Sequence, residues 1–235
     1  MSPFIGEFIG TALLIIMGGG VVANVVLNKT KGNNSGWIVI TFGWAMAVFI
    51  GVFVSTHFEG KGHLNPAVTI ALALFGDFDS SLVGTYIGAQ FSGAVAGSVI
   101  IWIAYKKHFD ETADKDLKLA VFCTAPGIRS PLFNLLTEII GTFVLVFGSL
   151  SMSKSARTLG ALDALPVALL ILAIGLSLGG PTGYAINPAR DLGPRIAHFL
   201  LPIPGKRDSD WGYSWIPVIG PVMGGMIAAY LFKYI

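Results

Sequence analysis

The residues best suited to a chemical task are two copies of the tripeptide Asn-Pro-Ala, which begin at Asn65 and Asn187 and precede short apolar stretches. An Asn side chain can cap the free backbone N–H groups at a helix start, and Pro fits the first helical turn, where its missing N–H is no loss. The motifs therefore predict two short helices, which start with Asn65, Pro66 and Ala67 and with Asn187, Pro188 and Ala189.

Two charged residues, Arg190 and Asp191, follow the second motif directly. Because a charge within a membrane is costly, we expect Arg190 to face a pore or a partner residue rather than lipid. Its guanidinium would offer fixed donors to solute oxygens and would repel cations. Asp191 could neutralise Arg190 or pair with Arg195 one helical turn further on, and we favour the pair with Arg195.

The composition indicates an integral membrane protein rather than a soluble protein with an unusually apolar core. Of 235 residues, 54% are hydrophobic and 12% are charged, against about 25% charged in an ordinary soluble domain. The net charge of +2 is small and gives no indication of a nucleic-acid partner. The single cysteine, Cys123, cannot form an internal disulfide. We expect no metal and no cofactor, because the sequence has no metal-ligand spacing and no nucleotide-binding loop.

Six apolar runs approach the roughly 20 residues that a membrane-spanning helix needs, and two more are much shorter. The predicted spans cover residues 5–27, 37–56, 82–105, 131–151, 162–178 and 213–234, and the predicted half-spans cover 65–75 and 187–200. No basic leader precedes the first run, so we expect it to be retained as a span and not removed as a signal peptide.

The order span, span, half-span, span occurs twice in a single domain, in halves 1–105 and 131–235 that the polar segment 106–130 links. The run Glu7-Phe-Ile-Gly-Thr in the first half matches Glu138-Ile-Ile-Gly-Thr in the second. With three full crossings in each half, the second half is inverted, and the half-spans meet near the middle of the membrane. Irregular backbone at that depth must line a cavity or contact protein. The sequence therefore predicts a pore or a central site.

Each predicted half-helix would direct its positive N-terminal end toward this centre, which disfavours cations and hydronium. The carboxamides of Asn65 and Asn187 could each donate an N–H to a passing oxygen. A water or alcohol that accepts from both would interrupt a chain of proton transfers. The alternative is that both Asn residues only cap their helices. Capping would be an adequate explanation if the chain had only one of the two motifs.

These features resemble the aquaporin (major intrinsic protein) family. The resemblance is based on the paired Asn-Pro-Ala motifs, the paired Glu-x-x-Gly-Thr and the run Gly-Tyr-Ala-Ile-Asn-Pro-Ala-Arg-Asp, and it covers essentially the whole chain. The Asp directly after the Arg resembles the aquaglyceroporin branch. The resemblance implies an all-α membrane fold of six transmembrane helices and two re-entrant half-helices in an inverted repeat. It also implies a homotetramer in the plasma membrane, with each subunit conducting.

The family has cytoplasmic termini, and the distribution of charge argues against them here. That orientation leaves only four of the fifteen basic residues on the inner side, Lys61, Lys154, Arg157 and Lys233. Inner loops normally carry the excess of Lys and Arg. We adopt the orientation that the resemblance implies.

By resemblance, four positions form a narrow solute filter: Trp44, Gly175, Tyr184 and Arg190. The length of segment 58–62 leaves open whether Trp44 or Phe42 supplies the first aromatic ring. We expect Gly175 to leave room that a His would fill. Trp44 and Tyr184 would contact the carbon chain of a solute while Arg190 and backbone carbonyls bind its hydroxyls, which suits glycerol as well as water.

The resemblance also assigns supporting residues. His63 would line the cytoplasmic half of the pore, or else be a hydrogen-bonded packing residue. Glu7 and Glu138 would bind backbone N–H groups and so hold the loops before the half-helices. As carboxylates within a membrane, they could instead belong to a proton relay.

The sequence thus predicts a passive channel for glycerol, water and other small uncharged solutes that excludes ions and protons and catalyses no reaction. A strict water channel is the nearest alternative, and Gly175 and Asp191 argue against it. An ion-coupled transporter of inverted repeats could use Glu7 and Glu138 as proton carriers. A third alternative, an adhesive or junction-forming membrane protein, is disfavoured because it would give no function to Arg190 in the pore.

Overall fold

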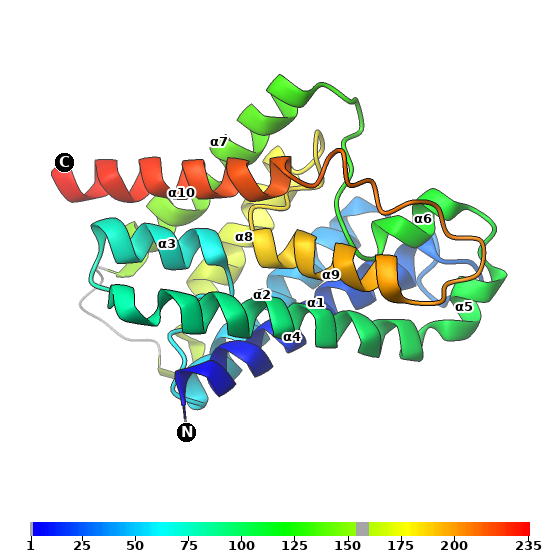
Figure 1. Cartoon of the computed structure of the whole chain (residues 1–235), viewed down its shortest axis with the longest axis horizontal. Coiled ribbons are helices and arrows are strands. Elements are labelled where there is room, and N and C mark those ends of the chain that lie inside the picture. The colour runs from blue at the N-terminus through cyan, green and yellow to red at the C-terminus, as the bar shows by residue number, and fades with distance from the viewer. Residues whose placement is uncertain (1, 154–159) are drawn as a thin grey trace.

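The structure is a computed structural model that describes residues 2–153 and 160–235, so Lys154 and Arg157 lie outside the described residues. Five of its helices are long and apolar enough to cross a membrane. They are α1 (Pro3–Val26), α2 (Trp37–His57), α4 (Val83–Ala104), α7 (Pro131–Ser153) and α10 (Ile216–Tyr234). Both termini lie toward the left-hand end of the bundle in Figure 1.

The predicted fifth span is shorter than expected. Helix α8 (Leu165–Leu178) has 14 residues, or about 21 Å of helix, against a hydrocarbon core of about 30 Å. The prediction began at 162, but that residue ends the 3₁₀ turn η2 (Gly160–Leu162). Pro166 lies in the first turn of α8, where Pro is favoured.

Both predicted half-helices form and begin where the Asn-Pro motifs place them. They are α3 (Pro66–Phe75) and α9 (Pro188–Leu200). The Asn65 side chain accepts from the backbone N–H of Ala67, and the Asn187 side chain accepts from those of Ala189 and Arg190. The Asn caps therefore determine where each half-helix starts.

The half-helices pack reciprocally across the molecule. Helix α3 packs mainly against α10, near the end of the chain, and α9 packs mainly against α4, in the first half. In Figure 1, α3 and α9 lie between α10 on one side and α4 on the other.

Glycines allow the long helices to approach closely in two pairs, α1 with α4 and α7 with α10, and the contacts in the two pairs are similarly close. A Cβ on Gly93 would lie 2.4 Å from the Phe8 carbonyl oxygen, and a Cβ on Gly224 would lie 2.2 Å from that of Ile139.

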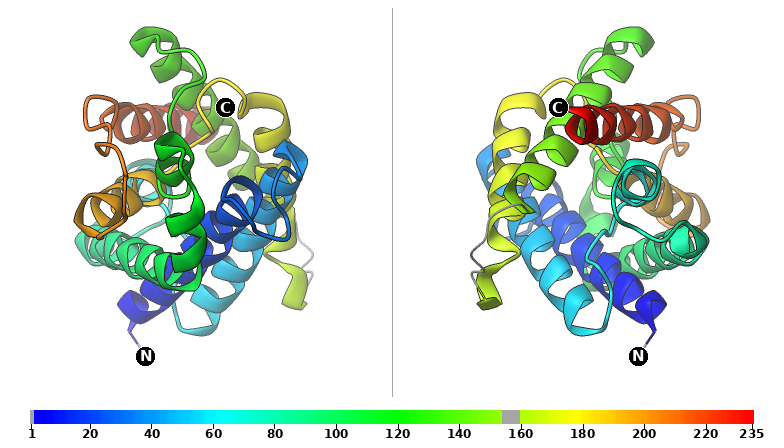
Figure 2. Two further views of the ribbon diagram at one scale, coloured as in Figure 1. Left: turned by 90° about the vertical axis from the view of Figure 1, so that its right-hand side faces the viewer. Right: turned by 90° about the vertical axis from the view of Figure 1, so that its left-hand side faces the viewer.

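The linking segment 106–130 is more structured than its polar composition suggested. It contains α5 (Lys106–Glu111) and α6 (Lys115–Ala120), which lie at the end of the bundle that faces the viewer in the left panel of Figure 2. Its apolar residues Phe109, Leu119 and Phe122 are fully buried. A second short turn, η1 (Ser80–Leu82), precedes α4.

Candidate functional site

A central cavity of about 230 Å³ brings together most of the predicted site residues. One part of its lining is apolar and comes from α1, α2 and α8, for example Leu14, Val48 and Ile171. The other part comes from the two loops that lead into α3 and α9. The predicted residues that line the cavity are Trp44, His63, Asn65, Tyr184, Asn187 and Arg190.

The two Asn side chains join the loops of the two half-helices. The Nδ2 of Asn65 donates to the carbonyl of Ile186, and the Nδ2 of Asn187 donates to the carbonyl of Leu64, both at 2.8 Å. A carboxamide has two N–H groups. One N–H of each Asn therefore binds the opposite loop, and the second is not used in that bond.

Both loops have strained backbone directly before their motifs. Leu64 has φ 49°, Ile186 has φ 43° and Tyr184 has φ 39°, a left-handed region that side-chain-bearing residues rarely adopt. For bulky residues such backbone costs roughly 1–3 kcal/mol and persists only when surrounding contacts hold it.

Glu7 and Glu138 provide those contacts. Glu7 accepts from the backbone N–H groups of His63 at 3.0 Å and Leu64 at 2.8 Å. Glu138 accepts from those of Ala185 at 3.0 Å and Ile186 at 2.7 Å. Further donors bind the same carboxylates: Ser55 and Gln90 to Glu7, and Thr182 to Glu138.

Arg190 is buried and lies against an aromatic ring. Its guanidinium carbon is 4.0 Å from the centre of the Trp44 ring, and its Nη1 donates to the carbonyl of Phe122 at 3.4 Å. Trp44 is 5% exposed, whereas Phe42 is 53% exposed. Of the two aromatic candidates, Trp44 is therefore the one that reaches the cavity.

The space beside Gly175 is not open, in contrast to the expectation from sequence. A Cβ on Gly175 would lie 2.8 Å from Cζ of Tyr184 and 2.9 Å from the methyl group of Thr41. Tyr184 lines the cavity and Gly175 does not. The absence of a side chain at Gly175 therefore makes room for the Tyr184 ring, and that ring forms the wall of the cavity there.

His63 combines the two roles that its position suggested. It lines the cavity, and its Nδ1 lies 3.1 Å from Oγ1 of Thr69. Its ring also packs against Phe78 and Tyr86, with centroid distances of 4.7 Å and 5.1 Å.

Asp191 pairs with Arg195, at 2.8 Å and with both side chains fully buried. The same carboxylate accepts from the backbone N–H and the hydroxyl of Thr124, both at 2.7 Å. Arg195 donates to the carbonyls of Thr124 and Ser209. This buried pair thus ties α9 to the segment 106–130 and to the loop before α10.

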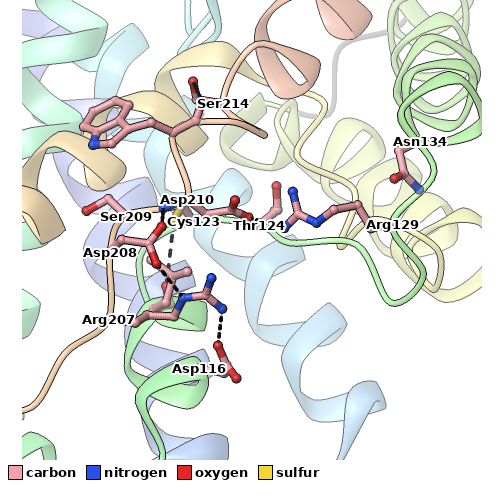
Figure 3. A network of polar contacts seen from close by, with 12 residues as sticks. Asp116, Cys123, Thr124, Arg129, Asn134, Arg207, Asp208, Ser209, Asp210 and Ser214 are labelled. Atoms are coloured by element: carbon pink, nitrogen blue, oxygen red, sulfur yellow. Dashed lines mark hydrogen bonds and ion pairs between the residues drawn. The ribbon is translucent and has the colours of Figure 1, made fainter.

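Figure 3 shows the outer part of this network. The Arg207 guanidinium binds both Asp116 and Asp208. The backbone N–H of Asp210, together with Arg207, holds the pKa of the Asp208 carboxyl below its usual value. Sequence reasoning missed Phe122 and Thr124, and the only sequence signal for them was the apolar stretch inside an otherwise polar linking segment.

Known proteins resemble this chain over almost its whole length. The Major intrinsic protein family matches residues 1–232. A probable glycerol uptake facilitator protein of Thermotoga maritima is 57% identical over the full length of both chains. The glycerol uptake facilitator protein of Bacillus subtilis is 53% identical over 99% of this chain and 84% of its own.

A solved structure has the same arrangement of helices. The X-ray structure of the aquaglyceroporin from Plasmodium falciparum superposes with a TM-score of 0.87 and 29% sequence identity, over 99% of this chain and 95% of that one. The all-α fold with two half-helices, which the sequence predicted, is confirmed. The chain belongs to the major intrinsic protein family.

Proposed function

We propose that the protein is a passive channel that passes glycerol, water and other small neutral solutes across the membrane and excludes ions and protons. The observation that carries the proposal is the cavity in which Arg190 lies over the ring of Trp44 while Tyr184 forms another wall. A three-carbon polyol has hydroxyls along one edge and C–H groups along the other. The guanidinium suits the hydroxyls, and the aromatic rings suit the C–H groups.

The centre of the cavity supports the exclusion of protons and cations. The free N–H groups of Asn65 and Asn187 and the positive ends of α3 and α9 favour a solute that accepts hydrogen bonds there. A water molecule so oriented cannot pass a proton along a continuous chain. Arg190 and Lys61, which also line the cavity, add positive charge.

The names of the similar proteins favour glycerol over water alone. Several relatives at 51–57% identity are glycerol uptake facilitators. The Tyr184 ring occupies the space beside Gly175, where a strict water channel would have a bulkier polar filter residue.

The contacts of the glutamates argue against an ion-coupled transporter. Each carboxylate oxygen of Glu7 accepts two hydrogen bonds. In Glu138, one carboxylate oxygen accepts two hydrogen bonds and the other accepts one. A carboxylate held by several donors is poorly suited to carry protons, because these hydrogen bonds favour its charged form and protonation would weaken them.

The wider assignments are part of the proposal. We infer one domain of two inverted halves, 1–105 and 131–235, in a homotetramer in the plasma membrane with cytoplasmic termini and no enzymatic activity. Reciprocal packing of α3 and α9 supports the inversion. The position of both termini at one end supports an even number of crossings.

The test is a light-scattering measurement on liposomes that contain the purified protein, shocked first with an impermeant osmolyte and then with glycerol. We expect fast shrinkage in both, followed in glycerol by protein-dependent re-swelling. Fast shrinkage without re-swelling would indicate a strict water channel. Glycerol entry that depends on a proton gradient would indicate a transporter.

A further inference from the structure

We infer that Trp37 is a positioning residue that sets the width of the filter by holding the Tyr184 ring in place. This inference depends on the proposed function. Trp37 lies at the start of α2, is 40% exposed, and does not line the cavity. It therefore influences a solute only through the residues that it contacts.

Trp37 contacts both members of the Gly175–Tyr184 pair. Its indole Nε1 donates to the backbone carbonyl of Gly175 at 3.0 Å. Its ring meets that of Tyr184 edge-on, with centroids 5.8 Å apart and an interplanar angle of 80°. A Cβ on Gly179 would lie 2.5 Å from Cδ1 of Tyr184 and 2.8 Å from Cζ2 of Trp37. The four residues are therefore packed without free space.

The hydrogen bond fixes the end of α8, which leads into the loop that carries Tyr184, to the start of α2. Gly175 lies in the last turn of α8, where backbone carbonyls lack partners within the helix. Trp37 supplies a donor from α2. The backbone N–H of Gly183 then donates to the carbonyl of Gly179 at 2.8 Å, so the chain from α8 to Tyr184 is anchored at its beginning.

Tyr184 depends on this packing because its own polar group does not anchor it. Within residues 2–153 and 160–235, its buried hydroxyl has no hydrogen-bond partner. The position of the ring is therefore set by Gly175, Gly179 and Trp37. Since Tyr184 lines the cavity and Trp37 does not, removal of the indole opens space behind the ring, and the ring can move back from the cavity.

The experiment compares Trp37→Ala and Trp37→Phe with the wild-type protein in liposomes. The readout is the permeability for a five-carbon polyol divided by that for glycerol, with water permeability measured in parallel. We expect Trp37→Ala to raise this ratio by about threefold or more, the scale of one lost hydrogen bond. Trp37→Phe keeps an aromatic ring but loses the N–H donor and part of the indole, so a smaller rise than in Trp37→Ala is expected.

Trp215 provides the matched control. It precedes α10 and is 44% exposed, close to the exposure of Trp37, and it does not line the cavity. Trp215→Ala should leave the ratio unchanged. Thermal melting of each variant in detergent identifies those that are merely unfolded, and Trp37→Phe provides a test if Trp37→Ala does not fold.

An unchanged or lower ratio in folded Trp37 variants would overturn the inference, as would a parallel loss of all three permeabilities. Failure of the proposed function has a different result, because the wild-type protein itself would then show no protein-dependent glycerol entry.

Discussion

Arg190 of α9 lies with its guanidinium carbon 4.0 Å from the centre of the Trp44 ring of α2. These residues belong to different halves of the chain, and both are buried. A close glycine makes the arrangement possible, because a Cβ on Gly18 would lie only 2.2 Å from the Trp44 ring. The Trp44 ring holds the planar guanidinium by a cation–π contact. One guanidinium nitrogen, Nη1, donates to the Phe122 carbonyl, and the remaining N–H groups of the guanidinium can donate to a solute.

Arg190→Lys should therefore separate the effect of the positive charge of Arg190 from the effect of its planar set of donors. Lysine keeps a positive charge but loses the planar donors and their stacking on Trp44. We expect glycerol permeability to fall by about tenfold, since one or two hydrogen bonds to the solute are lost. Proton leak, followed with a pH-sensitive dye inside the liposomes, should remain at the wild-type level. Arg190→Ala should lower glycerol permeability and also raise the leak. Equal leak in the two variants would show that the charge of Arg190 does not exclude cations.

Asn65→Asp tests the donors at the centre of the cavity. The substitution replaces the N–H group that binds the Ile186 carbonyl and places a negative charge at the start of α3. We expect a raised proton leak and a less stable protein, by about 1–3 kcal/mol for the buried carbonyl that loses its donor. Asn33→Asp is the control, because the Nδ2 of Asn33 also donates to a backbone carbonyl, that of Leu27, but Asn33 does not line the cavity. It should lower stability and leave the proton leak unchanged. Wild-type leak in Asn65→Asp would mean that the Asn65 side chain only caps α3 and binds the opposite loop, and does not exclude protons.

Gly175→His requires a second substitution to be informative. The single variant places its side chain where the Tyr184 ring lies, so we expect poor folding and loss of both permeabilities. Gly175→His with Tyr184→Ala removes the overlap, and the double variant should fold and pass water far better than glycerol. The two effects should be strongly non-additive, as expected for residues in contact. If the single variant alone lost glycerol selectively, the ring of Tyr184 would not occupy that space in the membrane.

Sequence reasoning succeeded where local chemistry determines structure. The Asn-Pro pairs predicted the first residues of α3 and α9 because a cap and a Pro at the first turn act within a few residues. The spacing of Asp191 and Arg195 likewise favoured the buried pair, since residues four apart lie on one face of a helix.

The remaining features depend on contacts between distant residues. Trp44 and Phe42 are two residues apart and lie on different faces of α2, so only the position of α2 against α1 and α9 decides which one meets Arg190. The relation of Gly175 to Tyr184 depends on the left-handed backbone of Tyr184, and side chains rarely adopt that conformation. The burial of Phe122 and Thr124 depends on how the segment 106–130 folds over α9.

The pair of Asp191 and Arg195 should be the most sensitive polar contact for stability. Asp191→Asn leaves a fully buried guanidinium without its counter-charge, and breaking such a pair costs about 3–5 kcal/mol. Thr124→Val removes one hydroxyl bond to the same carboxylate and keeps the backbone N–H bond, so a loss of about 1 kcal/mol is expected. Arg207→Gln disrupts the exposed pairs with Asp116 and Asp208, which contribute only about 0–1 kcal/mol. Thermal unfolding in detergent should rank the melting temperatures in that order, with Asp191→Asn lowest. If Arg207→Gln were as damaging as Asp191→Asn, the outer ion pairs would contribute as much to stability as the buried pair, and the ranking would be wrong.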